Sequence, residues 1–191
     1  MLTKVPADQS LAALSASLER AEIAHAFSGW IAHGYYTAPP SGQPPHTLWL
    51  GLHVFGTPHE EVSLHLDRLG IATQRSGHFG SGAILVVSCA DGVEARAAAR
   101  RIVRVPFGED TLPIVSPEDL IVDELRNGQP DWERLEQLLF ARLGELDTDY
   151  LLWALAGLPA DDLRRTRFFA LARTFAGLDE DDVPSLEKRA G

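Results

Sequence analysis

Apolar and polar residues follow one another along this chain in blocks with two different spacings. Blocks with apolar residues three or four positions apart predict amphipathic helices, and short apolar runs bounded by turn residues predict strands. Helices are predicted over residues 8–22, 58–69, 92–101, 117–126, 147–158 and 160–176, and strands over 23–27, 46–55, 71–75, 82–90, 102–107 and 112–115. This order predicts an α/β (α+β) fold, with a small mixed sheet flanked by helices.

Residues 26–54 place a strand end, a tight turn, a short helix, a loop and a second strand in direct succession. The turn is Ser28-Gly29, and the loop, residues 37–46, contains four prolines and one glycine, so it is neither helix nor central strand. A helix start that directly follows a Gly turn favours anions, and the strand beside it is where carboxylates for a metal ion would lie. We therefore expect any functional site in this stretch.

Two helix starts and one loop can be interpreted from their own residues. Thr57 is predicted to be the N-cap of the helix that follows it, with Glu60 completing a capping box. Asp91 and Glu94 have the same spacing before the next helix. The Gly-rich segment 76–82 lacks the Lys-Ser/Thr of a phosphate-binding loop and is predicted to be a hairpin connection.

Composition narrows the function classes. The chain has 191 residues, 45% of them hydrophobic, and a formal net charge of −10, which suits one domain with a helical extension and argues against a broad nucleic-acid-binding face. No apolar run approaches the roughly 18 residues of a membrane span, so we expect a soluble, cytoplasmic protein. The single cysteine, Cys89, is predicted to be a buried core residue. The seven histidines match no metal-ligand spacing, so no metal site is expected.

The order of elements around Ser28-Gly29 resembles the nucleotidyltransferase fold, in particular the minimal nucleotidyltransferases and abortive-infection toxins of bacteria. A second resemblance lies in residues 115–121, Val-Ser-Pro-Glu-Asp-Leu-Ile, and in Asp131-Trp132, which match a segment that follows the catalytic sheet in many such proteins. The resemblance covers about residues 10–158. It implies a nucleotidyltransferase-like core and a C-terminal helical subdomain, which we place at residues 1–115 and 116–178, with residues 179–191 as a flexible tail.

The chain departs from that family where the family binds its metal. The resemblance implies two carboxylates that hold Mg²⁺ on the strand after the turn, and these two positions fall on Trp49 and Gly51, which cannot bind a metal ion. Glu124 and Arg134 stand where the family has a basic and an acidic residue, respectively. We therefore expect a nucleotidyltransferase-like protein that has lost nucleotidyl transfer.

Such a protein would act through binding of a nucleotide or of a protein partner. The residues expected at a weak nucleotide site are Ser28, Gly29, Thr47 and Trp49, with no catalytic residue, no metal ligand and no cofactor.

Two alternatives stay open. The first is an active, Mg²⁺-dependent nucleotidyltransferase whose carboxylates come from elsewhere, such as Asp91, Asp119, Asp123 or Glu124. The second is a regulatory or antitoxin-like interaction protein, or a homodimer, that uses its leucine-rich helices and acidic surface. The sequence names no ligand, partner or pathway.

Overall fold

A computed structural model describes residues 7–37, 49–71, 77–79, 83–126, 129–142, 144–159 and 161–176. The chain divides into two compact units, one made of residues 1–32 and 41–116 and the other of residues 33–40 and 117–191. The domain division predicted between residues 115 and 116 stays a prediction, and the predicted tail, residues 179–191, lies outside the described residues.

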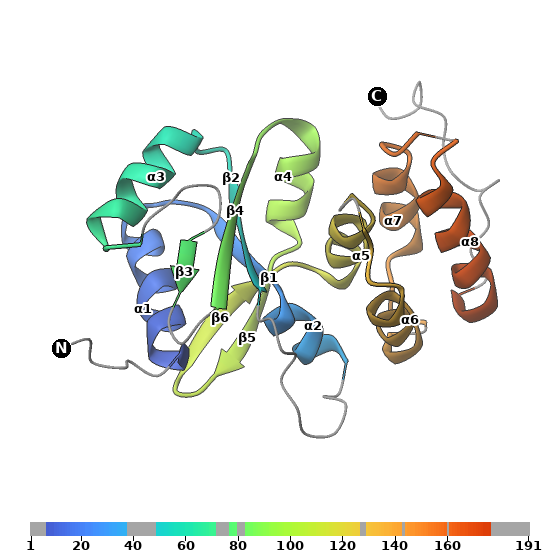
Figure 1. The fold of residues 1–191 in the computed structure, drawn as a ribbon, viewed down its shortest axis with the longest axis horizontal. Helices are drawn as coiled ribbons and strands as arrows, with labels where there is room; N and C mark the ends of the chain where they lie inside the picture. Colours follow the sequence, from blue (N-terminus) through green and yellow to red (C-terminus); the bar gives the residue numbers. More distant parts are fainter. Residues whose placement is uncertain are drawn as a thin grey trace. The chain divides into compact units, whose positions relative to one another are not determined.

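The first unit is built around a six-stranded mixed sheet with the strand order β3-β4-β2-β1-β6-β5 (Figure 1). Its strands are β1 (His25–Gly29), β2 (Trp49–Phe55), β3 (Gly77–Phe79), β4 (Ala83–Ala90), β5 (Val103–Phe107) and β6 (Asp110–Ile114). β1 pairs antiparallel with β2 and parallel with β6, and β2 pairs parallel with β4. The helices are α1 (Ala7–Arg20), α3 (His59–Arg68) and α4 (Gly92–Arg100). The predicted α/β class with a mixed sheet is confirmed.

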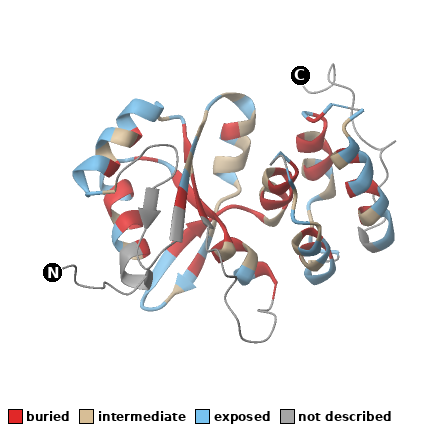
Figure 2. Cartoon of the chain, viewed as in Figure 1, coloured by how far each residue is buried: buried red, intermediate tan, exposed pale blue. Residues whose placement is uncertain are grey.

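One face of the central strands forms the hydrophobic core of this unit. The register pairs His25 with Val54 and Phe27 with Leu52, so these side chains share a face, and all four are buried (Figure 2). The predicted apolar stripe of α1 closes that face, because its three leucines are buried: Leu11, Leu14 and Leu18. In Figure 1, α1 and α3 lie on one side of the sheet and α4 lies on the other.

The second unit is helical. After the end of α2 (Trp30–Tyr36), it contains α5 (Pro117–Arg126), α6 (Trp132–Ala141), α7 (Thr148–Leu155) and α8 (Leu163–Ala176). The carboxylate of Asp131 accepts a hydrogen bond from the Arg134 N–H and caps α6, and that of Asp147 accepts one from the Tyr150 N–H and caps α7. None of the helices in the described ranges has the length and apolar content needed to cross a lipid bilayer.

Several predicted boundaries were wrong. The first strand begins at His25 instead of residue 23, because the Ile23 N–H bonds to Leu18 O and closes the end of α1. That strand also includes Ser28 and Gly29, which were predicted to be a turn outside it. The second strand is described from Trp49, while its predicted start at residue 46 and most of the predicted proline-rich loop lie outside the described residues, so both stay predictions.

Three local interpretations were also wrong. The capping residue of α3 is Pro58 and no side chain caps this helix, so the predicted capping box of Thr57 is not formed. The Gly-rich segment 76–82 contains a strand, β3, which pairs antiparallel with β4. Cys89 is half-buried on β4 rather than part of the core. By contrast, the predicted cap of α4 is confirmed, since the Asp91 carboxylate accepts a hydrogen bond from the Gly92 N–H at 2.6 Å.

Candidate functional site

The candidate site lies where β1 ends and α2 begins. Gly29 has a φ of +75°, a conformation that suits glycine, and it lets the chain pass from the strand directly into the helix at Trp30. Ser28, one residue earlier, is completely buried. The sequence therefore predicted the passage from strand to helix, although it placed the end of the strand two residues too early.

The side chain of Ser28 is bonded across the sheet to β2. Its Oγ lies 2.8 Å from His53 Nε2, within hydrogen-bonding distance. The register explains the contact, because Ser28 pairs with Gly51 and Ala26 pairs with His53, so that Ser28 and His53 are diagonal neighbours on one face. A buried hydroxyl requires a hydrogen-bond partner, and His53 supplies one.

The two positions that the resemblance assigns to metal-binding carboxylates lie on this same face. Residues 49, 51 and 53 alternate along β2, so their Cβ positions point to the side on which Ser28 lies. Gly51 is directly opposite Ser28. For Trp49 the structure describes the backbone only, and Thr47 lies outside the described residues.

The neighbouring strand adds no carboxylate to this face. Gly51 pairs with Val86 of β4 and His53 pairs with Ser88, and both β4 residues are exposed. Across the described side chains of β1, β2 and β4, the polar groups on this face are two hydroxyls, from Ser28 and Ser88, and the imidazole of His53. We name these residues and Gly51 the Ser28 face.

Two of the carboxylates that could replace the missing pair, those of Asp91 and Asp119, have other roles in the structure. That of Asp91 caps α4. That of Asp119 accepts a hydrogen bond from the Tyr150 hydroxyl at 2.5 Å, within the helical unit. The described residues contain no group of three or more His, Cys, Asp or Glu side chains arranged to hold a metal ion.

Glu124 and Arg134, whose charges are exchanged relative to the family, act on each other within the helical unit. Burial raises the pKa of the Glu124 carboxyl above its ordinary value of 4.5, while the backbone N–H of Asp131 and the charge of Arg134 oppose that shift. Arg134 also pairs with the Asp131 carboxylate at 3.2 Å. Both side chains therefore have partners within the helical unit, and their charges give no independent support for a loss of activity.

Glu118 of the second matching segment is also structural. This carboxylate is buried, and it accepts a hydrogen bond from the Asp147 N–H at 2.7 Å, where α7 begins. Together with the bond from Tyr150 to Asp119, it ties α5 to α7. The matching segment therefore holds the helical unit together through both of its acidic side chains.

His53 and Ser88 are the residues of the Ser28 face that the sequence did not reveal, and His53 is the one that bonds to Ser28. It was considered only as a metal ligand at histidine spacings. Its place two residues after Gly51 was the available signal, because alternate residues of a strand share a face. Recognising its contact with Ser28 needs the pairing register of β1 and β2, which no local pattern contains.

No protein-family model matches the chain, and no curated protein matches it. Among solved structures, it is similar to an antigenic nucleotidyltransferase-like protein from Paracoccidioides brasiliensis, with a TM-score of 0.48 and 10% identity over 88% of this chain and 87% of that chain. It is also similar to the antibiotic-resistance factor ANT(2'')-Ia. The solution structure of that protein has a TM-score of 0.44 and 13% identity over 83% of this chain and 86% of that chain.

The crystal structure of ANT(2'')-Ia in complex with adenylyl-2''-tobramycin has a TM-score of 0.45 and 13% identity, covering 81% of this chain and 92% of that chain. Of these similar structures, the Paracoccidioides brasiliensis protein carries the description nucleotidyltransferase-like. All three TM-scores lie below 0.5, so no activity and no binding residue is transferred from these proteins to this chain.

Proposed function

We propose that this chain is a nucleotidyltransferase-like protein that does not transfer nucleotides and that acts through binding. The observation that carries the proposal is the register of β1 and β2. It puts positions 49 and 51 on the same side of the sheet as Ser28, and these positions are Trp49 and Gly51 in the sequence.

The chemistry of nucleotidyl transfer supports this proposal. Phosphate charge is neutralised by Mg²⁺, and Mg²⁺ prefers oxygen ligands, mostly carboxylates and water. An indole and a hydrogen atom at the two assigned positions provide no such ligand. The imidazole and hydroxyl groups of the Ser28 face are poor replacements, because they carry no negative charge at neutral pH to hold a hard cation.

For the binding function we keep the residues that the sequence suggested. Ser28 and Gly29 at the end of β1, together with Trp49 of β2 and with Thr47, are proposed to contact a nucleotide without a metal ion. A tryptophan offers a flat surface on which a base can stack. A protein partner is the other proposed ligand class.

Both halves of the proposal can be tested on the full chain. The purified protein is incubated with Mg²⁺ or Mn²⁺, a labelled nucleoside triphosphate and RNA or protein acceptors, next to a heat-denatured sample. We expect no label on any acceptor or on the protein itself. Label transfer above the denatured sample would show that the chain is an enzyme and that its metal ligands lie elsewhere.

Nucleotide binding is measured separately by isothermal titration with ATP, GTP, CTP and UTP in the presence of a chelator. The matched variants are Trp49→Ala, on the Ser28 side of β2, and Trp153→Ala, in the helical unit. Binding that the first substitution abolishes and the second leaves intact supports the nucleotide site. Equal loss, or no binding by the unsubstituted chain, leaves the protein partner as the proposed ligand.

A further inference from the structure

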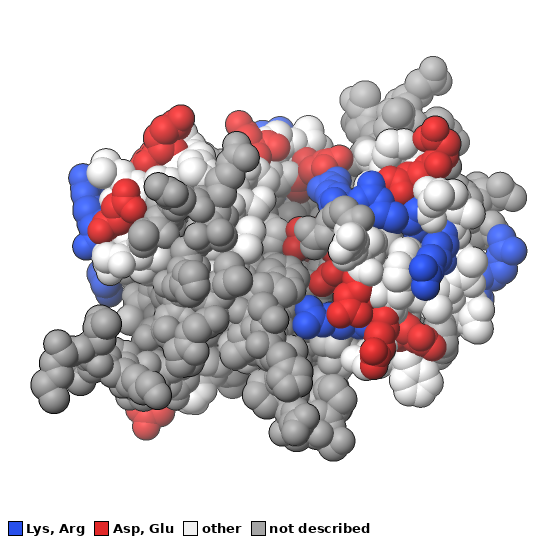
Figure 3. All heavy atoms as spheres, viewed as in Figure 1, with Lys and Arg blue, Asp and Glu red and all other residues white. Residues whose placement is uncertain are grey.

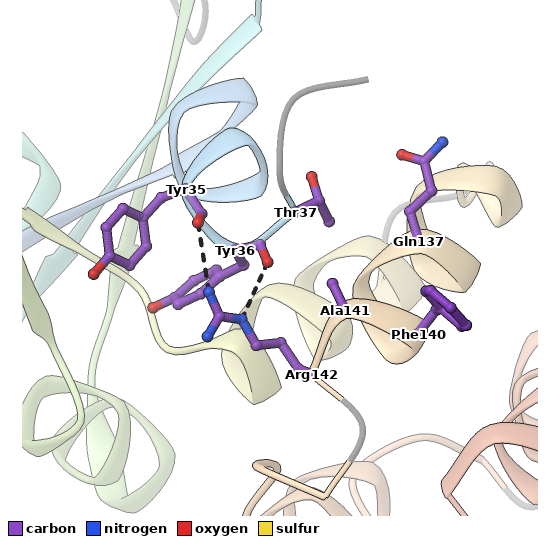
Figure 4. A pocket seen from close by; sticks show the side chains of 7 residues that line it. All are labelled: Tyr35, Tyr36, Thr37, Gln137, Phe140, Ala141 and Arg142. Carbon is purple, nitrogen blue, oxygen red and sulfur yellow. Dashed lines mark hydrogen bonds between the residues drawn. The ribbon is translucent and has the colours of Figure 1, made fainter. Parts of the chain in front are cut away.

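An open hollow lies in the helical unit, between the end of α2 and α6 (Figure 4). Its volume is about 710 Å³, and it is lined mostly by apolar and aromatic groups of seven residues: Tyr35, Tyr36, Thr37, Gln137, Phe140, Ala141 and Arg142. The hollow is open to solvent, and its lining offers aromatic and apolar groups for contact with an anchoring side chain. The Ser28 face contributes none of these residues.

The guanidinium of Arg142 fixes one wall of the hollow. Its Nε donates to Tyr36 O at 3.1 Å and its Nη2 donates to Tyr35 O at 3.5 Å, so it caps the last carbonyls of α2 (Figure 4). Its Nη1 pairs with the Glu145 carboxylate at 2.9 Å, and its charge lies 5.1 Å from the centre of the Tyr36 ring. The hollow is therefore preformed, and the charge of Arg142 is already matched by a carboxylate.

Two large apolar side chains stand at the rim. Phe140 is 70% exposed and Tyr35 is 47% exposed, although both line the hollow. A single exposed apolar residue needs no explanation, but Phe140 stands on the α6 side of a hollow that is itself lined by aromatic and apolar groups, while the Tyr35 ring points away from α6 (Figure 4). Aromatic residues at such places commonly become the centre of a protein–protein interface.

The exposed side of α6 around this hollow is acidic. Glu136 lies one helical turn before Phe140, and Glu133 accepts a hydrogen bond from the Gln137 amide at 3.3 Å, so both glutamates are on the side of α6 that borders the hollow. Both are exposed. Figure 3 shows acidic atoms gathered where Figure 1 draws α6.

We propose that this surface, the Phe140 surface, docks a protein segment that carries one apolar anchor side chain flanked by Lys or Arg. The anchor would enter the hollow and contact Phe140, while the basic residues would face Glu133 and Glu136. The charge complementarity selects this partner, because an acidic or neutral segment would gain nothing from the two glutamates. The proposal gives the protein partner named above a surface and a chemistry, and it stands whether or not the chain binds or transfers nucleotides.

The test uses the full chain and a defined probe. The probe is a rhodamine-labelled peptide in which leucine alternates with lysine, and a matched peptide replaces lysine by glutamate. Fluorescence anisotropy measures the affinity, and the shifts of backbone amide signals in NMR spectra locate the peptide. We expect only the lysine peptide to bind, with an affinity that falls as salt is added.

Matched variants separate docking on the Phe140 surface from general attraction to an acidic protein. Phe140→Ser and the double change Glu133→Gln with Glu136→Gln are each expected to weaken binding by about five-fold or more. The controls are Leu163→Ser, which changes an 84% exposed leucine of the same unit, and Glu60→Gln with Glu61→Gln on α3. The controls are expected to bind as the unsubstituted chain does.

Three outcomes would overturn the proposal. One is that the lysine peptide does not bind. Another is that Phe140→Ser and its leucine control weaken binding equally, which would make the attraction nonspecific. The third is a dimeric mass in light scattering that Phe140→Ser reduces to a monomer, since the surface would then belong to a second copy of this chain.

Discussion

At the scale of single residues, the hydrogen bond between Ser28 and His53 has the clearest energetic role. The hydroxyl of Ser28 is completely buried and the bond to His53 Nε2 measures 2.8 Å. Hydrogen bonds of this kind contribute about 1 kcal/mol to stability. Removing one partner costs more when the other stays buried without a hydrogen bond. His53 is only partly buried, so water can reach its ring if the serine is removed.

We expect Ser28→Ala to lower the free energy of unfolding by about 1 kcal/mol. The control is Ser63→Ala, since Ser63 Oγ is 3.2 Å from His59 Nδ1 in an exposed pair of the same chemistry, where water replaces the lost bond. Urea unfolding followed by circular dichroism measures both variants. Equal effects of the two substitutions would mean that the Ser28 bond has no special role in the fold.

The residues of the Ser28 face could be predicted from the sequence only in part. Ser28 and Gly29 were found because a Gly turn before a helix is a local signal. His53 was not found, because its contact with Ser28 depends on which residues of β1 and β2 face each other. Register is set by contacts between distant parts of the chain, and an error of one residue would turn each side chain to the other face of the sheet.

At the scale of elements, two hydrogen bonds between serine and histidine connect α1 to its neighbours β1 and α3 in the first unit. Ser15 Oγ lies 3.0 Å from His25 Nε2, and Ser17 Oγ lies 3.1 Å from His65 Nε2 on α3. His25 Nδ1 lies 2.9 Å from Ile23 O, and a carbonyl only accepts, so this nitrogen carries the proton. In the neutral ring Nε2 then accepts from the Ser15 hydroxyl, and burial, which lowers the pKa of His25, favours this neutral form.

This arrangement makes the stability of the chain depend on pH. Burial lowers the pKa of His25 and that of His33 below the ordinary value of 6.5. The unfolded chain therefore binds protons first as the pH falls below about 6.5, and stability is lost between that pH and the lowered pKa values. As the pH falls through this window, each histidine lowers the free energy of unfolding by at most about 1.4 kcal/mol per pH unit.

We expect His25→Gln to reduce the loss of stability between about pH 6.5 and 5. Glutamine retains hydrogen-bonding groups and does not titrate, while His59→Gln, which changes an exposed ring, is the control and is expected to keep the full slope. The measurement is urea unfolding at several pH values. Identical slopes for His25→Gln and the unsubstituted chain would show that His25 is already solvated in the fold.

The charges of α5 and α6 allow a second prediction at this scale. Glu124 is buried close to Arg134, and the family has the opposite charges at these positions. Glu124→Lys places two cations together, and Arg134→Glu places two carboxylates together. We expect the double variant to lose less free energy of unfolding than the two single variants lose together, by about 0.5–3 kcal/mol.

A double-mutant cycle by urea unfolding measures this coupling. Glu136→Lys combined with Arg134→Glu is the control, because Glu136 is exposed on the same helix. Additive effects of Glu124→Lys and Arg134→Glu would mean that the two charges do not act on each other. The exchange would then need a functional explanation, such as the loss of activity that the sequence first suggested.

Helices were easier to predict than strands, for a physical reason. The stripe Leu11, Leu14 and Leu18 and the start of α5 at Pro117 depend on residues close in sequence. β3 has three residues and exists through its pairing with β4, so segment 76–82 contained no periodic signal for it. Thr57 matched a capping pattern, yet the chain begins α3 one residue later, at His59.

At the scale of the whole molecule, the question is whether the Ser28 face is the remnant of a metal site. Ligands that bind only the folded chain raise its unfolding temperature by mass action, so metal binding is visible in the melting of the protein without any activity. We expect the unsubstituted chain to have the same unfolding temperature in Mg²⁺ or Mn²⁺ as in sodium chloride of equal ionic strength. Carboxylates placed at positions 49 and 51 should make the unfolding temperature rise when the metal ion is added.

The double variant Trp49→Asp with Gly51→Asp puts two carboxylates on the Ser28 side of β2, next to the hydroxyl of Ser28. At free Mn²⁺ about tenfold above its Kd, linkage contributes about 1.4 kcal/mol, which for a chain of this size raises the unfolding temperature by about 3–5 °C. Trp49→Asn with Gly51→Asn, which has the same shape without the charge, should gain no stability from Mn²⁺.

If Mn²⁺ stabilises the unsubstituted chain more than this neutral variant, a metal site has survived on the Ser28 face and the proposed loss of transfer chemistry is wrong. If neither variant gains stability, positions 49 and 51 do not border an ion site, and the resemblance that assigned them fails on this strand.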